Sequence, residues 1–204
     1  YDMTQEQLSR TLFPMGELSK VQARQIAREQ GFVNAAKPDS QDICFVPDGD
    51  YVKFMERYTG KSYAPGPFLD PQGNTVGTHR GAVGYTIGQR RGLGFAMGEP
   101  VYVYRKDMER NAVFVGPSAR LYTKKLQADD LNWIAFDTFP GKMRLKAKTR
   151  YRQTEQWADA RLLPDGMLEL EFDEPQRAVT AGQAVALYDG DTVLGGGTIR
   201  RAYD

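Results

Sequence analysis

The sequence predicts an α+β fold in three parts: a helical N-terminal part at residues 1–47, a small glycine-rich central domain at residues 48–117 and an all-β barrel at residues 118–204. Three observations support this division. Helix-capping patterns and helically spaced apolar residues are concentrated before residue 60, glycines crowd residues 61–99, and short alternating runs between turn sequences fill the rest. A chain of 204 residues is also long enough to bury more than one core.

Two helices and a short strand are expected in the N-terminal part. Each helix begins with a capping box, in which a hydroxyl covers a free helix N–H and an amide three residues later reaches back. The capping pairs are Thr4 with Gln7 and Ser19 with Gln22. The helices are predicted over residues 5–12 and 20–30, with Gly31 as the C-terminal cap of the second. Residues 43–46 then predict a short buried strand, closed by the turn sequence Pro47-Asp48-Gly49.

The central domain is predicted to begin with a helix over residues 50–58, where aromatic residues recur at helical spacing before Gly60. The sequence Pro71-Gln72-Gly73-Asn74 predicts a hairpin turn. Residues 101–105 and 112–115 predict two strands joined by a polar loop. Beyond residue 118, alternating runs predict short strands, among them residues 143–152, 167–172 and 184–188. Several short strands at this spacing are typical of a small barrel.

Composition excludes some classes of protein and leaves others open. The 27 Lys and Arg residues nearly balance the 26 Asp and Glu residues, so any polyanion site needs basic residues gathered on one face. No apolar run approaches the roughly 20 residues of a membrane span, and the first residues lack the features of a signal peptide. One cysteine and one histidine exclude an internal disulfide and a zinc site built from these ligands, so no metal is expected. The expected compartment is the cytoplasm, and a start without Met indicates a fragment or a processed chain.

Cys44 is the first candidate for chemistry. A thiol carries or transfers sulfur as its thiolate or persulfide, which requires partial exposure and a favourable local field. The polar run before Cys44 favours a loop that leads into a short strand, where active residues often lie. A free cysteine between Ile43 and Phe45 is, however, more often a small core residue. Spacing alone therefore favours the structural interpretation.

The glycine-rich stretch at residues 81–94 is the second candidate. Its backbone N–H groups could form an anion nest, to which Arg90 and Arg91 would add charge. The alternative is that the glycines serve tight turns and close strand crossings. No Gly-Lys-Ser/Thr follows, so a nucleotide P-loop is not supported. His79 could be a general base, but a lone histidine with no visible partner is more often structural.

The third candidate is a row of basic residues at every second position. The row consists of Lys142, Arg144, Lys146, Lys148, Arg150 and Arg152. In a strand these side chains would share one face at intervals of about 6.6 Å, so something negative should lie against them. That partner is either an RNA backbone or the acidic residues Glu169, Glu171 and Asp173 on a neighbouring strand.

Taken together, these segments resemble the tRNA-specific 2-thiouridylase family over nearly the whole chain. The matching stretches are Leu12 to Leu18, Lys37 to Phe45, Gly77 to Gly81, Tyr85 to Gly94, Lys148 to Gln153, Ala178 to Gln183 and Leu194 to Gly197. Several long motifs in the right order make the match specific. Asp42 stands where many members of the family have glycine, which affects the loop before Cys44 and leaves the cysteine in place.

The resemblance implies a transferase that acts on tRNA in two stages. ATP adenylates the C2 oxygen of the wobble uridine, and sulfur then displaces the adenylate. The sulfur arrives as a cysteine persulfide supplied by a sulfur-carrier protein, and Cys44 matches the persulfide cysteine. Arg150, Tyr151 and Gln183 match positions that contact tRNA, at its anticodon arm. Arg150 and Tyr151 would face opposite sides of an ideal strand, so a strand end or bulge is expected there.

The resemblance also implies that a large part of the enzyme lies outside these 204 residues. The family begins with a nucleotide-binding α/β domain that carries a Ser-Gly-Gly-rich phosphate loop and a second catalytic cysteine. Residues 1–47 would be the tail of that domain, and the C-terminal barrel would resemble those of translation factors. We expect this chain alone to be inactive. The main alternative is a non-catalytic RNA-binding barrel with a structural cysteine, and a protein-binding β domain is a third possibility.

Overall fold

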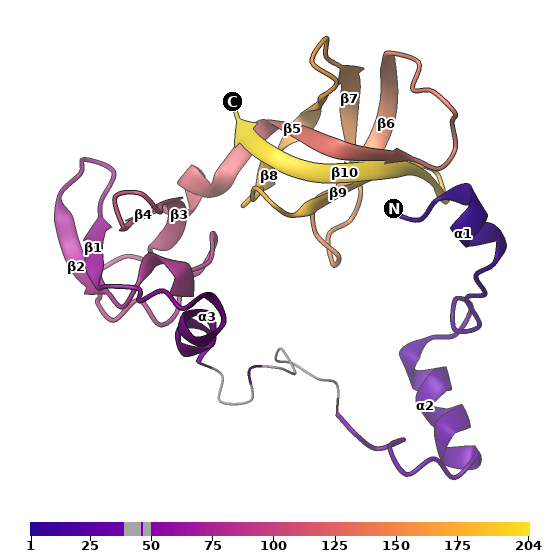
Figure 1. The fold of residues 1–204 in the computed structure, drawn as a ribbon, viewed down its shortest axis with the longest axis horizontal. Helices are drawn as coiled ribbons and strands as arrows, with labels where there is room; N and C mark the ends of the chain where they lie inside the picture. Colours follow the sequence, from indigo (N-terminus) through magenta and orange to yellow (C-terminus); the bar gives the residue numbers. More distant parts are fainter. Residues whose placement is uncertain (39–45, 47–49) are drawn as a thin grey trace. The chain divides into compact units, whose positions relative to one another are not determined.

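A computed structural model describes residues 1–38, 46 and 50–204. The described chain forms two compact units, one made of Tyr1–Thr4 with Lys61–Asp204 and the other of Gln5–Gly60 (Figure 1). The smaller unit is helical and the larger one contains every strand of the described residues. The predicted fold class is therefore confirmed, whereas the predicted domain boundaries at residues 47 and 117 stay predictions.

The smaller unit contains α1 (Gln5–Ser9), α2 (Lys20–Glu29) and α3 (Tyr51–Thr59). The predicted capping box of α2 is present, because the Ser19 hydroxyl accepts from the Gln22 amide N–H and the Gln22 side chain accepts from the Ser19 N–H. After α2, Gly31 adopts a φ of +70°, which lets the Phe32 N–H reach the Ala27 carbonyl at 2.9 Å. Gly60 ends α3 in the same left-handed conformation, as predicted.

The first helix is shorter than predicted. It ends at Ser9 rather than Leu12, and Arg10 and Thr11 donate to carbonyls three residues back, as in a tight final turn. The Thr11 hydroxyl donates to the Gln7 carbonyl at 2.7 Å. Hydroxyl side chains that bond to the backbone in this way compete with helix continuation.

The larger unit begins with a four-stranded sheet of order β2-β1-β4-β3. Its strands are β1 (Gly66–Leu69), β2 (Thr75–His79), β3 (Tyr102–Asp107) and β4 (Ala112–Gly116). The predicted hairpin turn joins β1 to β2, and the Asp70 carboxylate accepts from the N–H groups of Gln72 and Asn74 at 2.9 and 2.8 Å. A buried cluster that includes Phe68, Val113 and Leu93 fills the core of this sheet.

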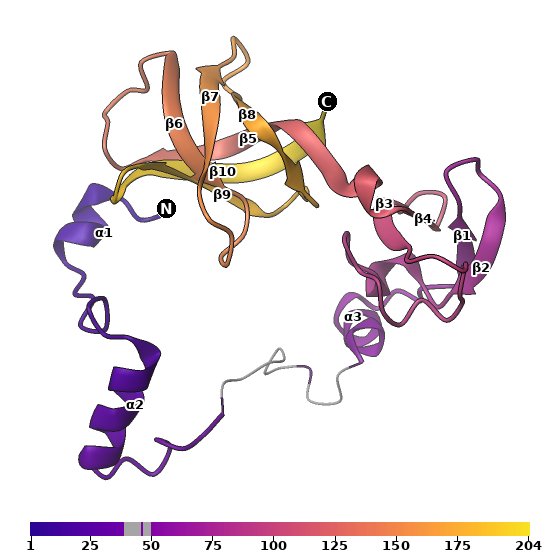
Figure 2. The same cartoon turned by 180° about the vertical axis from the view of Figure 1, so that it is seen from behind.

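The predicted barrel is a closed one of strand order β10-β5-β8-β7-β6-β9. Its strands are β5 (Tyr122–Trp133), β6 (Lys142–Lys148), β7 (Gln156–Leu162), β8 (Leu168–Arg177), β9 (Ala184–Asp189) and β10 (Thr192–Tyr203). Alternate residues such as Leu145, Leu170 and Leu187 are fully buried inside it. Figure 2 shows β6 and β7 standing side by side, with β10 crossing the barrel.

The strand predicted over residues 143–152 ends earlier, at Lys148. Thr149 turns the chain, because both its N–H and its hydroxyl donate to the Gln153 side-chain oxygen at 3.0 Å. Arg150, Tyr151 and Arg152 therefore lie in a loop. The strand end expected at Arg150 and Tyr151 is confirmed, and the six-residue basic row is reduced to four residues on the strand.

Candidate functional site

Barrel topology places two loops at the same end of the barrel. Strands β6, β7 and β8 pair antiparallel in turn. The connection from β6 to β7 and the connection from β8 to β9 therefore leave from the same end. These connections are residues 149–155 and 178–183. They contain Arg150, Tyr151 and Gln183, so the three predicted RNA-contact residues lie on neighbouring loops.

A direct hydrogen bond joins the two loops. The Arg150 guanidinium donates to the Ala178 carbonyl at 2.8 Å. Ala178 adopts a φ of +54°, its N–H donates to the Leu121 carbonyl at 2.7 Å, and its carbonyl also accepts from the Thr180 hydroxyl. Arg150 remains exposed and keeps further N–H donors available beyond this bond.

Hydrogen bonds among Thr149, Gln153 and Gln176 hold the 149–155 loop in shape. Thr149 and Gln176 are only 3% and 4% exposed, and Gln153 bridges them. Its side-chain oxygen accepts from Thr149, and its NH₂ group donates to the Gln176 oxygen at 2.5 Å. Tyr151, in contrast, is 94% exposed at the tip of this loop. An aromatic ring presented to solvent from a fixed loop is suited to stacking on a base.

Gln183 lies in the second loop. Its backbone is held by the Ile199 N–H, which donates to the Gln183 carbonyl at 2.8 Å. The residue is exposed, and its side-chain amide forms no hydrogen bond with any part of the chain that the structure describes. The amide can therefore donate to and accept from a ligand.

The glycine-rich stretch lies against this end of the barrel. Gly88 has a φ of +90°, and a Cβ built on it would lie 3.4 Å from the Ala178 Cβ. The Gly88 N–H donates to the Val103 carbonyl at 2.7 Å. The Arg177 guanidinium lies 5.3 Å from the centre of the Tyr102 ring. These contacts support the interpretation of the stretch as tight turns and close packing. The anion nest at Arg90 and Arg91 stays a prediction.

His79 is structural, as expected. It is fully buried, its Nδ1 accepts from the Gly81 N–H at 3.1 Å and its Nε2 lies 3.0 Å from the Asn111 carbonyl. This arrangement fits the neutral ring with its proton on Nε2. Burial lowers the pKa of His79 below its ordinary value. A neutral ring with both nitrogens engaged cannot serve as a general base.

The strand portion of the basic row shares one face, as predicted. This face is the outer one, because the intervening Leu145 and Ala147 are buried. The predicted acidic partners do not lie on a neighbouring strand, since β7 separates β6 from β8. Arg144 nevertheless reaches Asp173 with two hydrogen bonds.

The other two predicted acidic partners pair with cations outside the basic row. Glu169 pairs with Arg161 at 2.5 Å, and Glu171 pairs with Lys125 at 3.7 Å. Lys148 pairs with Glu155 at 3.2 Å. Within the described residues, no ion pair is formed by Lys142 or Lys146. Internal pairing therefore accounts for part of the row and leaves a positive surplus.

Cys44 falls in residues 39–45, outside the part of the chain that the structure describes. Among the described residues there is no group of His, Cys, Asp and Glu that could hold a metal ion. No described helix is long and apolar enough to cross a membrane.

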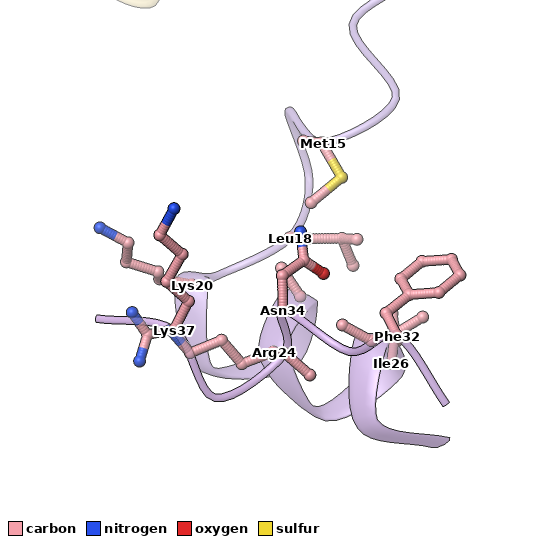
Figure 3. A pocket seen from close by; sticks show the side chains of 11 residues that line it. Met15, Leu18, Lys20, Arg24, Ile26, Phe32, Asn34 and Lys37 are labelled. Carbon is pink, nitrogen blue, oxygen red and sulfur yellow. The ribbon is translucent and has the colours of Figure 1, made fainter. Parts of the chain in front are cut away.

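The smaller unit has an open cavity of about 510 Å³ that the sequence did not suggest. Figure 3 shows the basic side chains of Lys20, Arg24 and Lys37 on one side of it and the apolar Ile26 and Phe32 on the other. None of the predicted site residues lines this cavity.

Comparison with known proteins covers nearly all of the chain. Family models match in consecutive segments: a tRNA methyl transferase HUP domain at residues 1–48, a tRNA methyl transferase PRC-barrel domain at residues 52–117 and an aminomethyltransferase beta-barrel domain at residues 123–199. The tRNA-specific 2-thiouridylase MnmA of Acetivibrio thermocellus is 52% identical over 202 residues, which are 98% of this chain and 56% of that protein. The chain belongs to the tRNA-specific 2-thiouridylase family.

Other members of this thiouridylase family show similar identity and coverage. The enzyme of Heliobacterium modesticaldum is 50% identical over 100% of this chain and 54% of its own length, and that of Halothermothrix orenii is 46% identical over 100% and 57%. The chain thus spans about half the length of the curated thiouridylases that it matches.

Proposed function

We propose that the whole protein is a tRNA-uridine 2-sulfurtransferase that thiolates C2 of the wobble uridine in the cytoplasm. Family membership supports the reaction class, because the relatives are named as tRNA-specific 2-thiouridylases. One structural observation supports the location of the tRNA contact. Arg150, Tyr151 and Gln183 come from separate loops, yet the topology gathers them at one end of the barrel, where Arg150 bonds to Ala178.

Each of these side chains has a role that its geometry allows. Arg150 would place its charge on a phosphate of the anticodon arm while its bond to Ala178 fixes its direction. Tyr151 would stack on an unpaired base, since its ring is exposed on an ordered loop. Gln183 would hydrogen-bond to a base edge or a ribose through its exposed amide.

Cys44 is proposed to carry the sulfur that enters the product. A sulfur-carrier protein that itself holds a persulfide would transfer its outer sulfur to the Cys44 thiolate and keep its own thiolate. ATP would supply the activation of the uridine by adenylating the C2 oxygen, with release of pyrophosphate. The outer sulfur of the Cys44 persulfide would then attack C2 with loss of AMP, and the second catalytic cysteine that the resemblance implies would form a disulfide with Cys44 as 2-thiouridine is released. The described residues contain no phosphate-binding loop that fits ATP, so we assign no step of adenylation to them.

Replacing Arg150 with alanine should weaken tRNA binding by the full-length protein in a salt-dependent manner. Loss of one phosphate contact is expected to lower the slope of log affinity against log salt concentration by about one unit or less. Fluorescence anisotropy of labelled tRNA, measured across a series of salt concentrations, gives this slope. The thermal unfolding temperature of the same variant, compared with that of the wild type, shows whether weaker binding comes from the lost contact or from a loss of folding.

Arg200→Ala is a matched control. Arg200 is also a barrel arginine, but Asp129 and Asp130 already hold its guanidinium at 2.5 and 2.8 Å. Its removal should leave the salt slope unchanged. If Arg150→Ala behaved like Arg200→Ala, the assignment of this barrel end to tRNA would be wrong.

A further inference from the structure

A row of side chains on the outside of the barrel combines cations with aromatic rings. Lys146 on β6 lies directly opposite Trp157 on β7 and directly opposite Tyr188 on β9. Residues paired in this way project from the same face of a sheet. The neighbours Ala147, Ala158 and Leu187 are buried, so the row points to solvent. We call Lys146, Lys148, Trp157 and Tyr188 the outer row.

Trp157 is the most unusual member of the outer row. It is 46% exposed, although a large apolar ring on a barrel surface normally seeks burial. The Arg144 guanidinium and the Lys146 ammonium each lie 5.3 Å from the centre of its ring. The Lys148 ammonium lies 4.9 Å from the centre of the Tyr188 ring. The outer row thus sets the exposed Trp157 ring and the half-buried Tyr188 ring among cations. Aromatic rings interleaved with cations are an arrangement that proteins use to hold RNA strands.

The charge of this surface favours a polyanion. Arg144 is held by Asp173 and Asp159, and Lys148 by Glu155. Lys146 forms no ion pair within the described residues, although its charge attracts that of the Glu155 carboxylate at longer range. Beyond the strand the surface continues into the exposed Arg150 and Arg152. Within the part of the chain that the structure describes, Lys146, Arg150 and Arg152 thus form no ion pair with a carboxylate at this end of β6.

The outer row is continuous with the proposed tRNA contact. The strand β6 leads directly from Lys146 and Lys148 into the loop that carries Arg150 and Tyr151, and β7 returns from that loop to Trp157. An RNA backbone bound at the loop can therefore run along the outside of the barrel without a break in positive charge.

From this geometry we propose that the outer row is a second RNA-contact surface, where Lys146 binds a phosphate and Trp157 packs against a ribose or an unpaired base of the same RNA. The inference rests on the proposed function, since it takes tRNA as the RNA. It extends the contact from the loop end of the barrel to the outer face of β6, β7 and β9 (Figure 2). An acidic protein partner is the competing occupant, and the test separates the two.

The test uses the full-length protein with a labelled tRNA transcript and two variants of the outer row. Trp157→Leu removes the aromatic face and should lower tRNA affinity roughly tenfold, within the range for loss of one stacked base. Lys146→Gln is a surface change that should not affect folding, and it should lower the salt slope by about one unit. Lys125→Gln is the control, because Lys125 lies on the barrel but pairs with Glu171. Thermal unfolding is measured for every variant.

The outcomes are distinct. Loss of affinity in Trp157→Leu and a reduced slope in Lys146→Gln, with Lys125→Gln like the wild type, support the proposal. Normal tRNA binding by both variants overturns the proposal. If these variants with normal tRNA binding also lost binding to the sulfur-carrier protein, the surface would belong to that partner instead. If the wild-type protein itself bound no tRNA, the proposed function would fail, and this inference with it.

Discussion

Full-length protein with Cys44 replaced by serine should bind tRNA normally and form no 2-thiouridine. Serine keeps the size and polarity of the side chain, but its oxygen cannot accept a sulfur atom to form a persulfide. The expected loss is complete, because the outer sulfur of that persulfide would be the atom that enters the product. Nucleoside analysis of the reacted tRNA by mass spectrometry measures the product, and anisotropy measures binding.

The same variant distinguishes the proposal from its rival. In a non-catalytic RNA-binding module, Cys44 would be structural, and its replacement would change stability and leave any modification unaffected. Alkylation of the native protein adds a second criterion. Prompt reaction at Cys44 agrees with a sulfur-carrying thiol, whereas complete protection in the native state and undiminished thiolation by Cys44→Ser would both contradict that role.

Replacing Glu169 with alanine should destabilise the barrel by about 2–3 kcal/mol at neutral pH. The Glu169 carboxylate accepts hydrogen bonds from Tyr203, from Gln127 at 3.1 Å and from Arg161 at 2.5 Å, and thereby ties together β5, β7, β8 and β10. The Glu169 side chain is only 16% exposed, so water cannot replace these donors fully. Urea denaturation gives the change in the free energy of unfolding.

The pH dependence follows from the same bonds. Hydrogen bonds from Tyr203 and Gln127, followed by that from Arg161, lower the pKa of Glu169 from 4.5 to about 2. A carboxyl group with a lower pKa in the folded state stabilises the fold fully above the unfolded pKa. That contribution should decline as the pH falls from about 4.5 towards 2 and should be missing in Glu169→Ala.

Glu171→Ala is the matched control, because Glu171 lies two residues away on the same face of β8. Its side chain is 56% exposed, and it pairs with Lys125 at 3.7 Å, so its removal should cost less than about 1 kcal/mol. Equal destabilisation by the two variants would refute the role given to Glu169.

Local patterns in the sequence predicted local structure well. The capping box at Ser19 and Gln22, the glycine after α2 and the turn at residues 71–74 all form as expected, because each depends on bonds between residues close in the chain. The alternation of β6 likewise placed its basic side chains correctly on one face of the strand. The family resemblance, which rested on several motifs in order, is confirmed by the relatives.

Features set by distant residues could not be predicted in this way. The end of β6 at Lys148 depends on Gln153, which is itself fixed by Gln176 on β8. The reach of Arg144 across β7 to Asp173 depends on strand order, which alternation alone does not specify. The sequence alone could not single out Trp157 as a candidate site residue, because its position opposite Lys146 depends on the register of β6 and β7.

The most direct measurement of the central claim is peptide mass spectrometry of the full-length protein after incubation with a persulfide-loaded sulfur-carrier protein. The peptide that contains Cys44 should gain the mass of one sulfur atom, and this added sulfur should disappear when tRNA and ATP are supplied, as 2-thiouridine accumulates. A Cys44 peptide that never gains sulfur while 2-thiouridine still forms would contradict the account.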